Sequence, residues 1–347
     1  MCSHVFKIGD IIISYKSTYK YLGILLNEFL DFSITESFLS DSAGRALGGI
    51  IGKFRSLGDL GYHTYTKLFQ CGVVPILDYG AGVWGFKETK FGDKVQNRAM
   101  RYFLGVHKYA PISALDGDIG WQSTSCRRKI EMFRLYNRFI DMSDSRISKK
   151  IFRFDIRANI SKTWGGDIRN LCADLDKPEL IRNFQKINLD TVKLSINEND
   201  QIKWGKEIMK KPKLRSYVLF KNKREVEPYI LSSIPRRQRS LVAQIRFGIL
   251  PLAIETGRFT GQKVEERLCK FCDNGVTESE THFLFECNLY AHDRDFWFQD
   301  CIVKNANFMN LSNKEKFILI MSQTFIKQTA FFIEKFWNSR RKKKCKR

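Results

Sequence analysis

The sequence is short of acidic residues. Its 347 residues include 37 Asp and Glu against 59 Lys and Arg, which gives a formal net charge of +22. The stretch from Lys335 to Arg347 holds eight of the basic residues and no acid, so the remainder of the chain still carries +14. A positive field of this size attracts polyanions, and contacts with phosphates supply most non-specific affinity for nucleic acids. The charge therefore predicts a nucleic-acid partner, although a solvated basic surface would have the same composition.

Several signatures are absent, and each absence argues against a class of protein. No Asp-Asp dipeptide occurs, so the paired-carboxylate turn of many polymerases is missing. Gly52-Lys53 is followed by Phe and has no glycine five residues before it, which excludes a P-loop. The first ten residues, MCSHVFKIGD, contain no apolar core of a signal peptide.

Long uninterrupted apolar runs are also lacking. The most apolar late segment, 317–337, is broken by Gln323, Lys327, Gln328 and Glu334, which fits an amphipathic helix better than a membrane span. The nine cysteines are an odd number and most are widely scattered, which favours reduced thiols over a disulfide framework. We therefore expect no membrane partner and an intracellular location, nuclear, cytoplasmic or both.

The residue pattern predicts a mainly α-helical protein that begins with a β-hairpin. Residues 6–26 contain β-branched and aromatic runs typical of strands. Helical spacing of apolar residues follows from 36 to 139, whereas 143–235 is weakly patterned and predicts a helical connector with loops. The expected segments are 1–32, a β-hairpin; 33–142, a helical bundle; 143–235, the connector; 236–300, an arginine-bearing helix and a Cys/His segment; and 301–347, an amphipathic helix with a basic tail.

Three of the expected helices carry arginines away from their apolar faces. In 126–142 these arginines recur at i, i+7 and i+11 opposite a mostly apolar face, and 92–104 and the helix after Pro235 have similar patterns. A basic row opposite a core-facing row suits a phosphate backbone, although an ordinary solvated face has the same pattern. The arginines are Arg98 and Arg101, then Arg127, Arg134 and Arg138, and then Arg236, Arg239 and Arg246.

The segment 268–287, LCKFCDNGVTESETHFLFEC, contains a candidate metal site. Cys269, Cys272, His282 and Cys287 have the spacing C-x2-C-x9-H-x4-C. Three thiolates and one imidazole are a usual set for tetrahedral Zn²⁺, and four protein ligands leave no position for a catalytic water. The spacing therefore predicts a structural zinc site, with residues 281–286 as a short helix between the last two ligands.

The segment leaves alternatives to this ligand set open. His292 is a rival fourth ligand and Cys301 a further one, and the other alternative is three free thiols near a chance histidine. The run His292-Asp293-Arg294-Asp295 holds two acids near a histidine, but on a helix they would point in different directions. We assign no catalytic residue.

Several stretches resemble a known family. YKYLGILL (19–26), VVPILDYGAGVWG (73–85) and VQNRAMRYFLGVHKYAP (95–111) resemble the region after the polymerase palm in reverse transcriptases of non-LTR retrotransposons, the long interspersed elements. RSLVAQIRFGILPLAIETGRF (239–259) and RLCKFCDNGVTESETHFLFECNLY (267–290) resemble the C-terminal arginine helix and Cys/His segment of the same proteins. The blocks occur in the order of the family.

The resemblance implies specific roles. Tyr21, Leu22 and Gly23 would lie beside a primer end, as in a primer grip, and 33–142 would be a helical thumb. The arginines of the thumb would follow a template–primer duplex, whereas Arg236, Arg237, Arg239 and Arg246 would face element RNA or target DNA. The Cys/His segment would hold the structural Zn²⁺ of a small C-terminal domain.

The resemblance also bears on catalysis. In the family, an RNA-directed DNA polymerase, the metal-binding aspartates lie upstream of the Tyr-Leu-Gly strand, in a part that this sequence does not contain. We therefore expect a truncated protein that binds RNA or DNA without catalysis. Two alternatives remain: a fragment of an intact polymerase, which in-frame palm codons upstream would reveal, and a host-adopted zinc-containing interaction protein.

Overall fold

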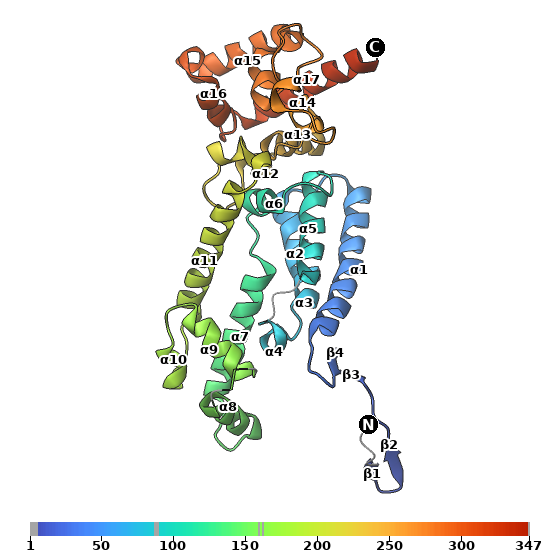
Figure 1. The fold of residues 1–347 in the computed structure, drawn as a ribbon, viewed down its shortest axis with the longest axis vertical. Helices are drawn as coiled ribbons and strands as arrows, with labels where there is room; N and C mark the ends of the chain where they lie inside the picture. Colours follow the sequence, from blue (N-terminus) through green and yellow to red (C-terminus); the bar gives the residue numbers. More distant parts are fainter. Residues whose placement is uncertain (1–5, 87–89, 159, 162, 346–347) are drawn as a thin grey trace. The chain divides into compact units, whose positions relative to one another are not determined.

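The computed structural model describes residues 6–86, 90–158, 160–161 and 163–345 and is mainly helical, which confirms the predicted fold class (Figure 1). The strands are β1 (Phe6–Ile8), β2 (Ile11–Ile13), β3 (Thr18–Tyr21) and β4 (Ile24–Asn27). The first helices are α1 (Ser33–Leu57), α2 (Tyr62–Gly72), α3 (Val74–Leu77), α4 (Ala81–Trp84), α5 (Phe91–Leu104), α6 (Ile112–Ile119), α7 (Thr124–Asp141), α8 (Ile147–Ala158), α9 (Trp164–Ala173) and α10 (Glu179–Arg182).

The later helices are α11 (Leu189–Met209), α12 (Pro228–Leu231), α13 (Arg236–Arg246), α14 (Ala253–Thr256), α15 (Ala291–Lys304), α16 (Asn313–Ile320) and α17 (Ile326–Cys345). A π-helical turn, η4 (His282–Glu286), and the 3₁₀ turns η1 (Pro212–Leu214), η2 (Tyr217–Leu219), η3 (Val264–Glu266), η5 (Asn288–Tyr290) and η6 (Phe308–Asn310) lie between them. Within the described residues, no helix has both the length and the apolar character that crossing a bilayer requires.

The chain divides into two compact units. Unit 1 consists of Met1–Gly48, Gln70–Val95 and Thr124–Val192, and unit 2 of Gly49–Phe69, Gln96–Ser123 and Lys193–Arg347. Each unit is therefore built from three stretches of sequence, whereas the sequence pattern suggested five consecutive segments. Those five boundaries stay a prediction.

The N-terminal β-structure forms two hairpins where the sequence predicted one. Strands β1 and β2 pair antiparallel, and so do β3 and β4, but the two pairs are separate sheets. The β3–β4 turn is made by Leu22 and Gly23, both with positive φ, a conformation that suits a tight hairpin turn. The second hairpin is fastened within unit 1, because the Tyr79 hydroxyl donates to the Leu22 carbonyl at 2.9 Å and Thr35 Oγ1 exchanges two hydrogen bonds with the Leu25 backbone.

Unit 1 is centred on a buried ion cluster between α1, α7 and the segment before α4. The Arg128 guanidinium donates to Glu36 at 2.7 Å and contacts Asp78 at 3.3 Å, and it lies over the Trp84 ring at 4.7 Å. Arg127 forms a further ion pair with Asp78 at 2.7 Å. Buried charges need such partners, since an unpaired one would cost several kcal/mol. The cluster therefore fixes α7 against α1 and α4.

Unit 2 has a comparable cluster around Asp118 at the end of α6. Its carboxylate accepts from Nε and Nη2 of Arg246 at 2.8 and 2.9 Å, and from the hydroxyls of Tyr217 and Tyr229 at 2.9 Å each. Arg246 also pairs with Glu227 at 2.8 Å. Burial lowers the pKa of the Arg246 guanidinium, but the two carboxylates raise it by more, so it stays charged. The cluster joins α6, η2, α12 and α13.

We expect Asp118→Asn to lower the free energy of unfolding by about 3–5 kcal/mol, because it removes the fully buried one of the two carboxylates that compensate Arg246. Urea unfolding followed by circular dichroism measures this loss. The matched control is Glu198→Gln on the exposed side of α11, which should change stability by less than about 0.5 kcal/mol. Equal effects of the two substitutions would contradict the role given to the cluster.

Candidate metal centre

A short loop in unit 2 positions the first two cysteines. Leu268 and Thr277 form an isolated β-bridge, and the Cys269 N–H donates to the Val276 carbonyl at 2.9 Å. Gly275 has a φ of 63°, which lets the chain turn back between the two sides of the bridge. The C-x2-C pair therefore lies on a turn that this bridge closes.

The π-helical turn η4 positions the other two candidates. The Cys287 N–H donates to the His282 carbonyl at 2.9 Å, a bond that spans five residues, and Cys287 itself is extended. π-Helical turns are rare and often occur at functional sites. The sequence predicted a short helix at 281–286 with a ligand at each end, and the observed turn agrees with this apart from its π-helical winding.

The four side chains meet in one cluster. The candidate ligand atoms of Cys269, Cys272, His282 and Cys287 all lie within 4.8 Å of one another. Cys269 Sγ is 3.9 Å from Cys287 Sγ, and Cys272 Sγ is 3.4 Å from His282 Nε2. A tetrahedral Zn²⁺ with Zn–S distances of about 2.3 Å and a Zn–N distance of about 2.0 Å would need separations of about 3.8 and 3.5 Å. This Cys₃His cluster therefore has the donors and spacing to hold a metal ion.

Groups around the cluster orient the ligands. Backbone N–H groups of Phe271 and Cys272 interact with the Cys269 sulfur, and that of Leu289 interacts with Cys287. The buried His282 Nδ1 has no hydrogen-bond partner among the described residues, and its nearest anion is the Glu286 carboxylate at 3.4 Å. A carboxylate that accepts a hydrogen bond from the other ring nitrogen of a metal-binding histidine fixes the ring and makes Nε2 a stronger ligand for the metal ion.

Helix α17 braces the loop between the first two cysteines. The Arg340 guanidinium lies over the Phe271 ring at 4.1 Å and forms two hydrogen bonds with the buried carboxylate of Glu278. Lys343 Nζ donates to the Phe271 carbonyl at 3.0 Å. Burial lowers the pKa of Arg340, but Glu278 raises it by more. Part of the basic C-terminal stretch is therefore a structural support of the cluster.

The alternative ligands lie outside this cluster. His292 is exposed and packs edge-on against Phe296, with ring centroids 5.0 Å apart. Cys301 is buried but does not belong to the group. Among the described residues, the group of four is the one with three or more His, Cys, Asp or Glu side chains placed to share an ion.

Four of the predicted nucleic-acid-binding arginines are exposed: Arg98, Arg134, Arg138 and Arg237. Arg134 pairs with Glu131, and Arg237 pairs with Glu334 at 2.9 Å. Tyr21 and Leu22 are exposed at the β3–β4 turn, next to Gly23. These positions are accessible, and their predicted roles beside nucleic acid stay predictions.

Three other arginines that were predicted to bind nucleic acid are partly buried. Arg127 pairs with Asp78, Arg101 donates to the Ala110 carbonyl at 3.4 Å, and Arg236 lies over the Tyr102 ring at 4.5 Å. Each of these guanidinium groups has a partner within its own unit. Their contribution to an outer surface is correspondingly smaller than the sequence suggested.

Two predictions for α13 are wrong. Arg246 is fully buried against Asp118, and Arg239 is buried against Asp59, with Nη2 and Oδ1 2.6 Å apart. Both the arginine-bearing side of α13 and its Leu241 side are buried. The two guanidinium groups can be buried because carboxylates distant in sequence neutralise them. These side chains therefore hold unit 2 together and cannot face a polyanion in this structure.

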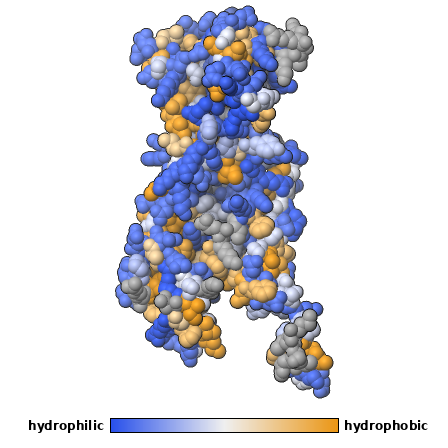
Figure 2. Space-filling view, viewed as in Figure 1, coloured by the Kyte–Doolittle hydropathy of each residue, from blue (hydrophilic) through white to orange (hydrophobic). Residues whose placement is uncertain are grey.

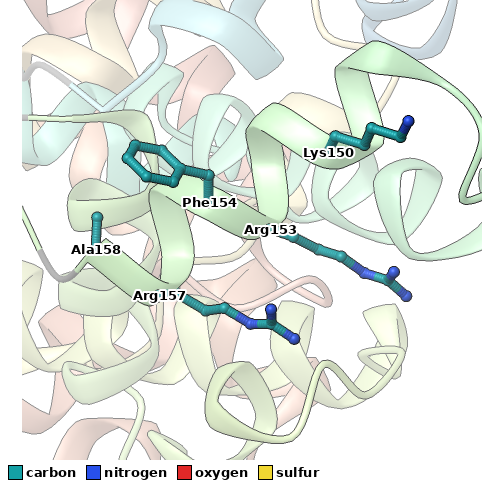
Figure 3. A pocket seen from close by; sticks show the side chains of 5 residues that line it. All are labelled: Lys150, Arg153, Phe154, Arg157 and Ala158. Carbon is teal, nitrogen blue, oxygen red and sulfur yellow. The ribbon is translucent and has the colours of Figure 1, made fainter.

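Sequence reasoning also missed a basic surface on α8. Lys150, Arg153 and Arg157 project from one side of this helix, and with Phe154 and Ala158 they line a pocket of about 450 Å³ (Figure 3). The spacing i, i+3 and i+7 was the available signal. It lay in a stretch that showed no clear overall periodicity and was assigned to a connector.

No protein-family model, curated protein or solved structure matches the chain. The resemblance to reverse transcriptases therefore stays a prediction.

We expect Cys269→Ser to abolish metal binding and to lower the free energy of unfolding of unit 2 by more than about 3 kcal/mol, because metal-binding energy is folding energy. Mass spectrometry of the metal content and thermal unfolding measure the two effects. Cys126→Ser, at a buried cysteine of unit 1, is the control and should keep about one metal ion per chain at a cost of about 1 kcal/mol. Similar losses in both variants would remove the case for a metal centre.

Acid should release the metal ion. Burial raises the pKa of the Cys287 thiol to about 12 and also raises that of Cys269 in the metal-free chain. Both thiols are then protonated at neutral pH and must lose protons to bind a metal ion, so affinity should rise with pH. Three thiolate ligands would give a slope of up to about three in log affinity per pH unit. Chelator competition between pH 5 and 8 measures it, and a pH-independent affinity would contradict thiolate ligation.

Proposed function

We propose that this protein binds nucleic acid without catalysing a reaction on it, and that a structural Zn²⁺ in the Cys₃His cluster stabilises its C-terminal region. The observation that carries the first part is the net charge of +22 together with exposed arginines at three of the positions selected from helical spacing, Arg98, Arg134 and Arg138. Exposed cations in rows can replace counterions along a phosphate backbone, which is the main source of non-specific affinity.

The choice of zinc rests on the donor set. Three soft thiolates and one imidazole favour Zn²⁺ over hard cations such as Mg²⁺ or Ca²⁺, which prefer oxygen ligands. Four protein ligands complete a tetrahedron, so the ion would hold the loop of Cys269 and Cys272 against the turn of His282 and Cys287. Its contribution would be folding energy and not chemistry on a substrate.

We further propose that the chain is related to the C-terminal part of non-LTR retrotransposon reverse transcriptases. The support is the order of the sequence blocks between residues 19 and 290. An RNA-directed DNA polymerase of which this is one part would share that support. A host-adopted interaction protein would share it too, and a partner that remains bound after nuclease treatment would favour that alternative.

Binding should weaken steeply with salt and show little sequence preference. Fluorescence anisotropy with a labelled 20-base-pair duplex, measured over a series of KCl concentrations, tests this. Arg134→Gln combined with Arg138→Gln should lower the slope of log affinity against log salt by about 1.8, since each lost phosphate contact on a duplex contributes about 0.9.

The control for this experiment removes two exposed lysines from elsewhere, as Lys314→Gln with Lys327→Gln. This control lowers the net charge by the same amount as the arginine variant. A smaller change in slope for the control than for Arg134→Gln with Arg138→Gln would show that the row on α7 makes specific contacts. An affinity that does not depend on salt, or no binding to any nucleic acid, would contradict the proposed function.

A further inference from the structure

Helix α8 presents a basic row to solvent in unit 1. Lys150, Arg153 and Arg157 fall at i, i+3 and i+7, and Figure 3 shows their side chains projecting to the same side of the helix. Arg153 pairs with Asp144 at 2.9 Å, and the two side chains are 38% and 67% exposed. Arg157 lies 5.7 Å from the centre of the Phe184 ring. The row spans two turns, about 10 Å, which is long enough for more than one phosphate.

A second row on the same helix is apolar and exposed. Ile147, Ile151 and Phe154 recur at i, i+4 and i+7 and are 74%, 62% and 71% exposed. Figure 2 shows hydrophobic residues at the surface over this helix, on a face that is otherwise mostly hydrophilic. Single exposed apolar residues are ordinary, but three in a row along a helix mark a surface that a partner covers.

The buried face of α8 makes this surface a fixed platform. Phe152 stacks on Phe139 with ring centroids 5.0 Å apart and meets Trp164 edge-on at 6.2 Å. Lys149 Nζ, from the same buried side, donates to the Ile140 carbonyl at 2.6 Å. The two exposed rows therefore keep their positions without a partner, which lowers the entropic cost of binding.

We propose that this surface of α8 binds single-stranded nucleic acid, with phosphates on Lys150, Arg153 and Arg157 and an unpaired base against Phe154. The inference rests on the proposed function and names the strand type and the site. The hollow that these residues line has a volume of about 450 Å³ and is open to solvent, so a strand could reach it.

The strand type follows from the apolar row. A duplex offers phosphates to a surface helix but keeps the faces of its bases stacked inside, so it would leave Ile147, Ile151 and Phe154 uncovered. A single strand offers phosphates and exposed base faces together, and stacking on an aromatic ring contributes about 1–3 kcal/mol per base. An acidic amphipathic peptide also combines the two chemistries, but the net charge of +22 favours a polyanion with one charge per residue.

The test uses the full chain and anisotropy with labelled (dT)20 and with a 20-base-pair duplex. Phe154→Ala should weaken (dT)20 binding about tenfold and leave duplex binding within twofold. Its control is Phe29→Ala, at another exposed aromatic of unit 1, which should change neither. Both side chains are exposed, so folding should be intact, and circular dichroism and thermal unfolding check this.

A second variant tests the basic row. Lys150→Gln with Arg157→Gln should lower the (dT)20 salt slope by about 1.4, because each phosphate of a single strand contributes about 0.7. Lys203→Gln with Lys206→Gln, two exposed lysines of α11, is the charge-matched control and should give a smaller change.

Three outcomes would overturn the inference. If the wild type binds both probes and neither α8 variant differs from its control, the site is elsewhere although the proposed function stands. If Phe154→Ala has no effect while the basic variant weakens both probes equally, α8 contacts duplexes through charge alone. If the wild type binds neither probe, the proposed function fails as well.

Discussion

Buried arginine–carboxylate pairs are the constraint on which the rest of this structure depends. Arg128 with Glu36 in unit 1 and Arg246 with Asp118 in unit 2 are almost inaccessible to solvent, so neither charge could exist there without its partner. The buried acids are Glu36, Asp118, Glu227, Glu255, Glu278 and Glu280, and the buried bases are Arg128, Lys149, Lys221, Arg239, Arg246, Arg294 and Lys316. The two sets nearly cancel among the described residues, so the positive excess does not come from fully buried side chains.

The same balance of charge operates around the metal cluster. A Zn²⁺ ion with three thiolates would carry a net charge of −1, and the buried Glu278 carboxylate beside Cys269 adds another negative charge. Arg340 and Lys343 of α17 supply two positive charges at this place, the first paired with Glu278 and the second bound to the Phe271 carbonyl. The basic C-terminal stretch, which the sequence predicted as a basic tail, would thus partly compensate the negative charge of a metal-bound site.

Local patterns were predictable from the sequence, and distant pairs were not. The spacing of Cys269, Cys272, His282 and Cys287 identified the cluster because all four ligands come from one stretch of 19 residues. Helical periodicity likewise located α5 and α7 to within two residues and placed the start of α13 directly after Pro235. The burial of Arg246 could not be inferred, because Asp118 lies 128 residues away and only the tertiary fold brings it close. A basic row in sequence therefore predicts charge, but its exposure depends on which carboxylates the fold places opposite it.

The metal cluster and the α7 and α8 surfaces belong to different units. Residues 269–287 lie in unit 2, whereas α7 and α8 lie in unit 1 and are fixed by Arg128 with Glu36 and by the stacking of Phe152 on Phe139. Metal-binding energy stabilises the elements that close the cluster, which include η4 and the docked end of α17. Zinc would therefore maintain the C-terminal region, while the capacity of unit 1 to bind a polyanion would depend on its own core.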